Sequence, residues 1–155
     1  MKKIVVMSDN HGHDIDIMTV QEENKDADLF IHCGDSEGYL ELLENFIAVK
    51  GNNDWNLPLE RVIVFEFDGM KMAVIHGDQF GYFSRESRMV EFSEEYGVQI
   101  IFTGHTHMPQ NEVLENGVRV INPGSTYLPR GGTPRSYAVV YKEGNKIDVE
   151  FRGIE

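Results

Sequence analysis

The sequence lacks the marks of several common protein classes. It has one cysteine, Cys33, so no disulfide can form within the chain. No apolar run approaches the roughly 20 residues that a membrane-spanning helix needs. The apolar stretch at residues 4–7 is too short for a signal peptide, and Asp9 follows it closely. We therefore expect a cytoplasmic protein with no membrane partner, since a reducing compartment suits a chain without disulfides.

Basic residues are also scarce. The chain has 14 Lys and Arg against 26 Asp and Glu, a formal net charge of −12. A nonspecific hold on nucleic acid depends on Lys and Arg that displace counterions, so a nucleic acid polymer is not an expected partner. A small phosphate compound stays compatible with this charge, because bound divalent cations would make a pocket locally positive.

Internal repeats, low-complexity segments and linkers are likewise missing, so the 155 residues are expected to form one domain spanning 1–155. Apolar periodicity and turn residues divide the chain into a first half of alternating strands and helices and a second half of hairpins. The predicted strands and helices of the first half are 2–7, 14–24, 28–33, 37–44 and 46–49. The second half has hairpins at 62–77, 111–122 and 136–153, a helix at 84–96 and a strand at 99–104.

The predicted fold is of the α/β (α+β) class. A single doubly wound parallel sheet would not contain three hairpins, and residues 8–13, SDNHGH, do not supply the G-x-G-x-x-G of a Rossmann domain. Two mixed sheets packed face to face and flanked by helices accommodate both halves of the chain. This arrangement is a four-layer αββα sandwich.

Six apolar runs end in carboxylates, amides or histidines, usually beside glycine. They read IVVMSDNHG, LFIHCGD, FIAVKGNND, MAVIHGD, IIFTGHTH and VRVINPGS. The first five supply seven candidate ligands: Asp9, His11, Asp35, Asn52, His76, His105 and His107. Seven such groups are enough to hold two divalent metal ions. Mixed oxygen and imidazole donors suit Mn, Fe, Zn, Ni or Co better than Ca or a metal bound only by thiolates.

Local spacing supports this interpretation. Asp9 and His11 are two residues apart, and in extended backbone positions i and i+2 point the same way. His105 and His107 repeat that spacing. An ionised Asp35 after a buried strand would be costly without a cation, and its two oxygens could bridge two ions.

The ordered set D-x-H, G-D, G-N-x-D, H-G-D and G-H-T-H resembles the calcineurin-like metallophosphoesterases, above all their small bacterial and archaeal phosphodiesterases. The resemblance covers nearly the whole chain and includes segments 122–125 and 128–132. Each motif alone is weak, but their ordered combination is specific. The αββα sandwich of that family agrees with the fold predicted from the hairpins.

The resemblance implies a role for each candidate ligand. Asp9, His11 and His107 would bind one metal ion, whereas Asn52, His76 and His105 would bind the second. Asp35 would bridge both. The resemblance also implies hydrolysis of a small phosphodiester by in-line attack of a metal-bound hydroxide, with Asp35, Asn52 and His76 among the catalytic residues. Mn²⁺ is the leading metal, and Ni, Fe, Co and Zn are alternatives.

One position departs from the superfamily. Many members have a histidine directly after the asparagine ligand, as proton donor to the leaving group, and this chain has Asn53. Positioned acid catalysis is worth about 10²–10⁴-fold, so we expect a preference for diesters with good leaving groups. His13 is a candidate for the missing acid and Arg130 for a cation that faces the phosphate; either can instead be an ordinary surface residue.

Other polar and aromatic residues have simpler interpretations. His32 lies inside an apolar strand and is expected to be structural, and Asp54 and Asp78 are expected to hold turns or orient neighbours. Trp55 can form a wall for a base or aryl group, or anchor a dimer contact. A phosphomonoesterase of the same fold and a non-catalytic scaffold are the alternative functions, and a homo-oligomer is possible. All four matched histidines are present, which favours an enzyme.

Overall fold

The computed structural model describes residues 1–154. No helix in this range is long and apolar enough to cross a membrane. Two α-helices are present, α1 (Ile15–Glu23) and α2 (Arg85–Tyr96), with two short 3₁₀ helices, η1 (Leu40–Leu43) and η2 (Asp78–Phe80). The strands, in chain order, are β1 (Lys2–Met7), β2 (Leu29–His32), β3 (Phe46–Ala48), β4 (Val62–Phe67), β5 (Met70–Ile75), β6 (Ile100–Phe102), β7 (Pro109–Val113), β8 (Arg119–Pro123), β9 (Ser136–Glu143) and β10 (Lys146–Gly153).

The strands form two five-stranded sheets. The first has the order β10-β9-β1-β2-β3 and the second the order β4-β5-β6-β8-β7. In the first sheet β1, β2 and β3 are parallel, and β9 pairs with both β1 and β10 in antiparallel fashion. In the second sheet β5, β6 and β8 are parallel, and β4 and β7 pair antiparallel to its two outer members. Both sheets are therefore mixed, as predicted.

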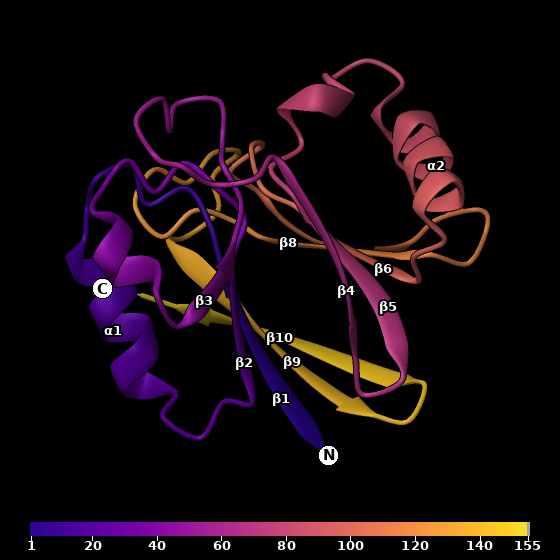
Figure 1. The fold of residues 1–155 in the computed structure, drawn as a ribbon, viewed down its shortest axis with the longest axis horizontal. Coiled ribbons are helices and arrows are strands. Elements are labelled where there is room, and N and C mark those ends of the chain that lie inside the picture. The colour runs from indigo at the N-terminus through magenta and orange to yellow at the C-terminus, as the bar shows by residue number, and fades with distance from the viewer. Residues whose placement is uncertain (155) are drawn as a thin grey trace.

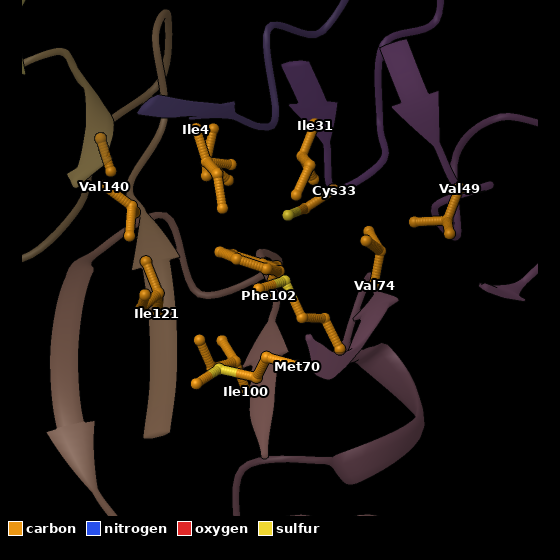
Figure 2. Close-up of a cluster of buried hydrophobic side chains, with 13 residues drawn as sticks. Ile4, Ile31, Cys33, Val49, Met70, Val74, Ile100, Phe102, Ile121 and Val140 are labelled. Carbon is orange, nitrogen blue, oxygen red and sulfur yellow. The ribbon is translucent and has the colours of Figure 1, made fainter. Parts of the chain in front are cut away.

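Three apolar clusters separate four layers. The central cluster lies between the sheets, where Ile4 and Ile31 of the first sheet meet Phe102 and Ile121 of the second (Figure 2). A second cluster joins α2 to the outer face of the β5–β6–β8 sheet, and a third joins α1 to the outer face of the β1 sheet. Figure 1 shows the two helices on opposite sides of the sheet pair. The predicted αββα sandwich is confirmed.

The parallel strands explain the six apolar runs. Each run ending in polar residues is one of β1, β2, β3, β5, β6 and β8, which are the strands with parallel partners. In β1, residues Ile4–Met7 are fully buried, so both strand faces must be apolar and the sequence shows no alternation. In open α/β sheets, ligands bind beyond the carboxyl ends of parallel strands, which is where these polar residues lie.

One predicted element differs in type from the observed one. Residues 37–44 were expected to form a short helix, and only the 3₁₀ turn η1 forms there. Its four residues form too few hydrogen bonds to offset the free-energy cost of nucleating an α-helix. All three predicted hairpins are present, as β4–β5, β7–β8 and β9–β10.

Candidate metal centre

The loops after β1 and β6 are not extended. Strand β1 ends at Met7, and Asp9 and His11 have φ values of 56° and 41°; His105 and His107 have 73° and 61°. The inference that i and i+2 point together because of extended backbone is therefore wrong for both pairs. These residues, with Asp35, adopt left-handed backbone, which is strained for non-glycine residues and concentrates at functional sites.

Tertiary packing nonetheless brings three of these side chains together as a first candidate metal group. Asp9, His11 and His107 each offer a ligand atom within 4.8 Å of the other two. The Asp9 Oδ1 atom lies 3.1 Å from His107 Nε2 and 3.5 Å from His11 Nε2. The two imidazole Nε2 atoms are 3.2 Å apart, so all three atoms face one small volume.

A second candidate group consists of Asp9, Asp35 and His76. His76 Nε2 lies 3.2 Å from Asp35 Oδ2 and 3.8 Å from Asp9 Oδ1. Asp35 Oδ2 is also 3.8 Å from His11 Nε2, which belongs to the first group. Asp9 thus belongs to both groups, and Asp35 lies within 3.8 Å of a histidine of each. The bridging role expected of Asp35 stays a prediction, and the geometry adds Asp9 as a residue shared by both groups.

The outer nitrogens of the three imidazoles are all held by oxygen atoms. His76 Nδ1 donates to the Cys33 carbonyl at 2.7 Å, and His107 Nδ1 donates to the Leu128 carbonyl at 2.6 Å. His11 Nδ1 contacts the Glu37 carboxylate. A carbonyl only accepts, so Nδ1 must bear the proton and Nε2 is free to present a lone pair to the centre. Metal-binding histidines characteristically have such outer partners, which fix both tautomer and ring orientation.

Two buried atoms test whether a divalent cation suits this cluster. Asp9 Oδ1 and His76 Nε2 are buried and have no hydrogen-bond partner among the residues that the structure describes. A buried polar atom without a partner costs free energy, and a cation between these groups would remove that cost. The donor set of carboxylate oxygens and imidazole nitrogens fits a borderline divalent metal.

The charges in the cluster shift its titrations strongly. Burial alone would raise the pKa of Asp9, but the neighbouring His107, His11 and His76 rings, which favour its ionised form, lower that pKa overall. Burial opposes protonation of His76, yet Asp35 and Asp9 raise its pKa to about 9. Protons and a cation would therefore compete for the same atoms, which makes metal affinity pH-dependent.

The remaining two predicted ligands lie beside these groups. The His105 backbone N–H donates to Asp9 Oδ2 at 3.1 Å, and its ring packs edge-on against His76 at 5.2 Å between centroids. Burial, followed by the charge of His76, lowers the pKa of His105. Asn52 is exposed in the turn after β3, directly after Gly51. A Cβ at Gly51 would collide with the Asp35 carboxylate, so only glycine lets this turn approach the centre so closely.

Asp54 holds the loops of the centre, as predicted. It is 2% exposed, and its carboxylate accepts backbone N–H groups of Asp35 at 2.7 Å, Gly51 at 2.8 Å and Glu37 at 2.8 Å. The neighbouring Asn53 donates its backbone N–H to Asp35 Oδ1 at 2.8 Å and its side-chain amide to Oδ2 at 3.0 Å. Asn53 therefore orients Asp35, although an amide cannot deliver a proton.

His32 is a structural residue, which confirms the prediction. Its Nδ1 accepts the Gly34 backbone N–H at 3.0 Å, and its Nε2 therefore donates to Asn10 Oδ1 at 2.8 Å. Burial lowers the pKa of His32 to about 4, so the ring is neutral. Asp78 also has the expected role of orienting a neighbour, since it accepts two bonds from the Arg61 guanidinium at 2.7 and 2.8 Å.

The two side chains assigned lesser catalytic roles lie differently. His13 stacks on Tyr127 with 4.3 Å between centroids, and its Nδ1 lies 2.9 Å from Asp16 Oδ1. It is part of neither candidate metal group, and its role as an acid stays a prediction. Arg130 is exposed, and its backbone N–H donates to the His107 carbonyl at 3.1 Å. Its guanidinium lies 3.5 Å from the Tyr82 hydroxyl, and the Tyr82 ring is 5.4 Å from that of His105. Arg130 therefore lies at the rim of the candidate metal centre.

Sequence reasoning missed two residues that support the centre. Glu37 contacts His11, and its position two residues after Asp35 was the only available signal. Arg85, the first residue of α2, donates to the carbonyls of Gly77 at 2.7 Å, Gly81 at 3.1 Å and Gly104 at 3.4 Å. It thereby ties together the loops that follow His76 and precede His105. Nothing local in the sequence marks Arg85, because its partners are backbone atoms of other loops.

Comparison with known proteins agrees with this geometry. Residues 1–145 match the model of the calcineurin-like phosphoesterase superfamily domain. The probable metallophosphoesterase YsnB of Bacillus subtilis (strain 168) is 35% identical over 153 residues, which cover 96% of this chain and 89% of YsnB. The chain belongs to the calcineurin-like phosphoesterase superfamily. The predicted family membership is thus confirmed.

Solved structures give the same result. A predicted phosphoesterase from Streptococcus pneumoniae TIGR4 superposes with a TM-score of 0.89 at 30% identity, covering 97% of this chain and 88% of that one. A structure described as a novel archaeal phosphodiesterase has a TM-score of 0.71 at 25% identity and covers 97% of this chain and 99% of its own. Both similarities extend over nearly the whole chain.

Proposed function

We propose that this protein is a divalent-metal-dependent phosphodiesterase that hydrolyses small phosphodiesters at a dinuclear centre. The observation that supports this most directly is the placement of Asp9 and Asp35 between imidazoles whose outer nitrogens are already held. Such an arrangement leaves inward-facing ligand atoms and little freedom to turn them elsewhere. The description of the archaeal relative as a phosphodiesterase supports the diester class.

The ligand assignment within this proposal follows the motifs. Asp9, His11 and His107 would hold the first ion, Asn52, His76 and His105 would hold the second, and Asp35 would serve as a ligand to both. Mn²⁺ is the favoured metal, with Ni, Fe, Co and Zn as alternatives. When bound, two such ions would stabilise negative charge on the phosphoryl oxygens and activate water as a nucleophile.

Two other residues have supporting roles: one would neutralise charge on the phosphate, and one positions a candidate ligand. Arg130 at the rim can pair with a non-bridging phosphoryl oxygen, because its planar guanidinium matches that geometry. Asn53 keeps Asp35 oriented and supplies no proton to the leaving group. Diesters whose leaving groups depart without protonation are therefore the preferred substrates, and monoesters with alkyl leaving groups are poor ones.

The test is hydrolysis of bis(p-nitrophenyl) phosphate and p-nitrophenyl phosphate by chelator-stripped protein, with and without Mn²⁺. We expect metal-dependent turnover that favours the diester. His107→Gln should abolish this turnover, whereas Asp78→Ala, which breaks only the pair with Arg61, should preserve it. No turnover with any divalent metal would refute the enzyme and favour a scaffold. Faster turnover of the monoester would favour the phosphomonoesterase. A homo-oligomer stays a prediction.

A further inference from the structure

A cleft of about 340 Å³ opens beside the metal centre. Glu37, Gly38, Asn53, Asp54, Trp55, Asn56 and Leu57 line it. The lining comes from two loops, one after β2 and one after β3, which also hold Asp35 and Asn52. The cleft is therefore built from the same loops as the centre.

Two of the lining residues connect the cleft directly to the candidate ligands. The Glu37 carboxylate contacts His11 Nδ1, and the Asn53 amide donates to Asp35 Oδ2 at 3.0 Å. A phosphodiester whose phosphate lies at the centre must place its two ester substituents beyond the ligand shell. Because Glu37 and Asn53 line the cleft and also contact candidate ligands, the cleft adjoins the position of one substituent.

Trp55 gives the cleft an oriented aromatic wall. It is 80% exposed, although a large apolar side chain gains free energy when it is buried. Its indole N–H donates to the Asn52 carbonyl at 2.9 Å, which fixes the ring beside a candidate ligand. An exposed and oriented indole next to a site offers a stacking surface to a flat group.

The charge of the cleft limits which substituents it can accept. Glu37 and Asp54 are its charged lining residues, and no lysine or arginine of the described chain lines it. The three N–H donors held by Asp54 partly satisfy its carboxylate, whereas Glu37 is about one-third exposed. A substituent with its own carboxylate or phosphate would be repelled here.

We propose that this cleft, walled by Trp55, binds one ester substituent of the substrate and selects a flat, uncharged aromatic group. This inference rests on the proposed function for the position of the phosphate. It narrows the substrate class to phosphodiesters that bear at least one neutral aromatic substituent, a chemistry that includes aryl esters and nucleosides without further phosphate.

The first measurement is the fluorescence of Trp55, which is the only tryptophan in the chain. Protein kept in saturating divalent metal is titrated with diphenyl phosphate, diethyl phosphate and bis(p-carboxyphenyl) phosphate. We expect a saturable change in emission with diphenyl phosphate and at least tenfold weaker binding of the other two. Binding of diphenyl phosphate that leaves the emission unchanged, shown by competition with turnover, would overturn the proposal.

The second measurement separates the ring from its hydrogen bond. Trp55→Ala should raise KM for bis(p-nitrophenyl) phosphate about tenfold, since it removes the aromatic face on which a flat group stacks. Trp55→Phe lacks the same N–H but keeps a ring, and it should stay within about threefold of the wild type, as stacking alone requires. Equal losses in both variants would assign the effect to the Asn52 hydrogen bond and refute the stacking role.

The outcomes distinguish the two proposals. If the wild-type protein hydrolyses no diester with any metal, the proposed function fails, and the emission titration alone then decides whether the cleft binds aryl groups. If turnover occurs but Trp55→Ala leaves KM unchanged, the enzyme stands and the cleft proposal fails. An Asn56→Lys variant adds a cation to the lining and should improve binding of the carboxylated diester without weakening that of diphenyl phosphate.

Discussion

Replacing Asp54 by alanine tests whether one buried carboxylate organises the loops of the metal centre. The side chain accepts three backbone N–H groups, from Asp35, Gly51 and Glu37, at 2.7 to 2.8 Å. Two of these donors belong to buried residues, Asp35 and Gly51. Alanine would leave them without an acceptor inside the protein, and the loop after β2 would lose its attachment to the loop after β3.

The expected cost is about 3–5 kcal/mol of unfolding free energy. Each hydrogen bond to a charged group contributes roughly 1.5–3 kcal/mol, and an unsatisfied buried donor costs about 1–3 kcal/mol. These contributions are not additive, because the Glu37 N–H lies nearer the surface and water can reach it. Asp54→Asn keeps one carbonyl acceptor and should lose roughly half as much. Such losses are a large part of the 5–15 kcal/mol that stabilises a typical domain.

The assay is urea unfolding of chelator-stripped protein, so that metal binding does not contribute. Asp78→Ala is the matched control, because it also removes a carboxylate with two close bonds, but to the partly exposed Arg61. That variant should lose only about 0–1 kcal/mol. A loss below 1 kcal/mol in Asp54→Ala, or equal losses in both variants, would refute the reasoning.

Metal affinity gives an independent readout of the same substitution. The Asp54 carboxylate hydrogen-bonds to backbone rather than to side chains in the described residues, and it holds the backbone of Asp35 and of Gly51, which precedes Asn52. Removing such outer support typically lowers metal affinity about 10–100-fold. Calorimetric titration of the stripped Asp54→Asn protein with Mn²⁺ should show this weakening even where the fold is retained. Unchanged affinity would mean that the loops keep their positions without Asp54.

Three further predictions concern other residues. Asn53→His should raise the hydrolysis rate of esters with alkyl leaving groups by up to about 10²-fold and change the rate for aryl diesters little. The measurement is the ratio of the two rates, and an unchanged ratio would contradict the argument that the leaving-group acid is missing. Burial lowers the pKa of His32 from 6.5 in the unfolded chain to about 4 in the folded protein. Its neutral form therefore contributes about 3 kcal/mol to stability above pH 6.5, and this contribution is lost as the pH falls toward 4. The unfolding free energies of wild-type and His32→Gln protein, measured across this range, should converge on the acid side. Arg85→Lys keeps the positive charge but loses the guanidinium that donates to three backbone carbonyls, and it should weaken Mn²⁺ binding to the chelator-stripped protein about tenfold. Equal binding of Mn²⁺ by both proteins would mean that Arg85 is merely a surface cation of α2.

Much of the fold could be predicted from local sequence. The hairpin turns at Asp68-Gly69, Asn116-Gly117 and Gly144-Asn145 are encoded by the residues themselves, because these types tolerate the required backbone angles. Three hairpins beside parallel strands exclude a single doubly wound sheet, which leaves a two-sheet arrangement. The 3₁₀ turn in place of a helix at 40–43 was not predictable in this way, because so short a segment takes its shape from its surroundings.

The identities of the candidate ligands were also determined by sequence alone. Polar residues after apolar runs must lie at strand ends, and the ordered motifs assign them to a family. The reason first given for the pairing of Asp9 with His11 was nonetheless wrong. Both lie in left-handed backbone beyond β1, a feature that residue type does not reveal.

Only the tertiary structure decided how these residues meet. His11 and His107 are 96 residues apart, and their approach depends on the packing of two sheets across one core. The same packing selects the carbonyls of Cys33 and Leu128 as imidazole partners, and any residue could supply a carbonyl. Sequence therefore predicted the candidate ligands of the centre, because side-chain chemistry is local. The structure specified their distances, partners and unsatisfied atoms, because those depend on contacts between segments far apart in the chain.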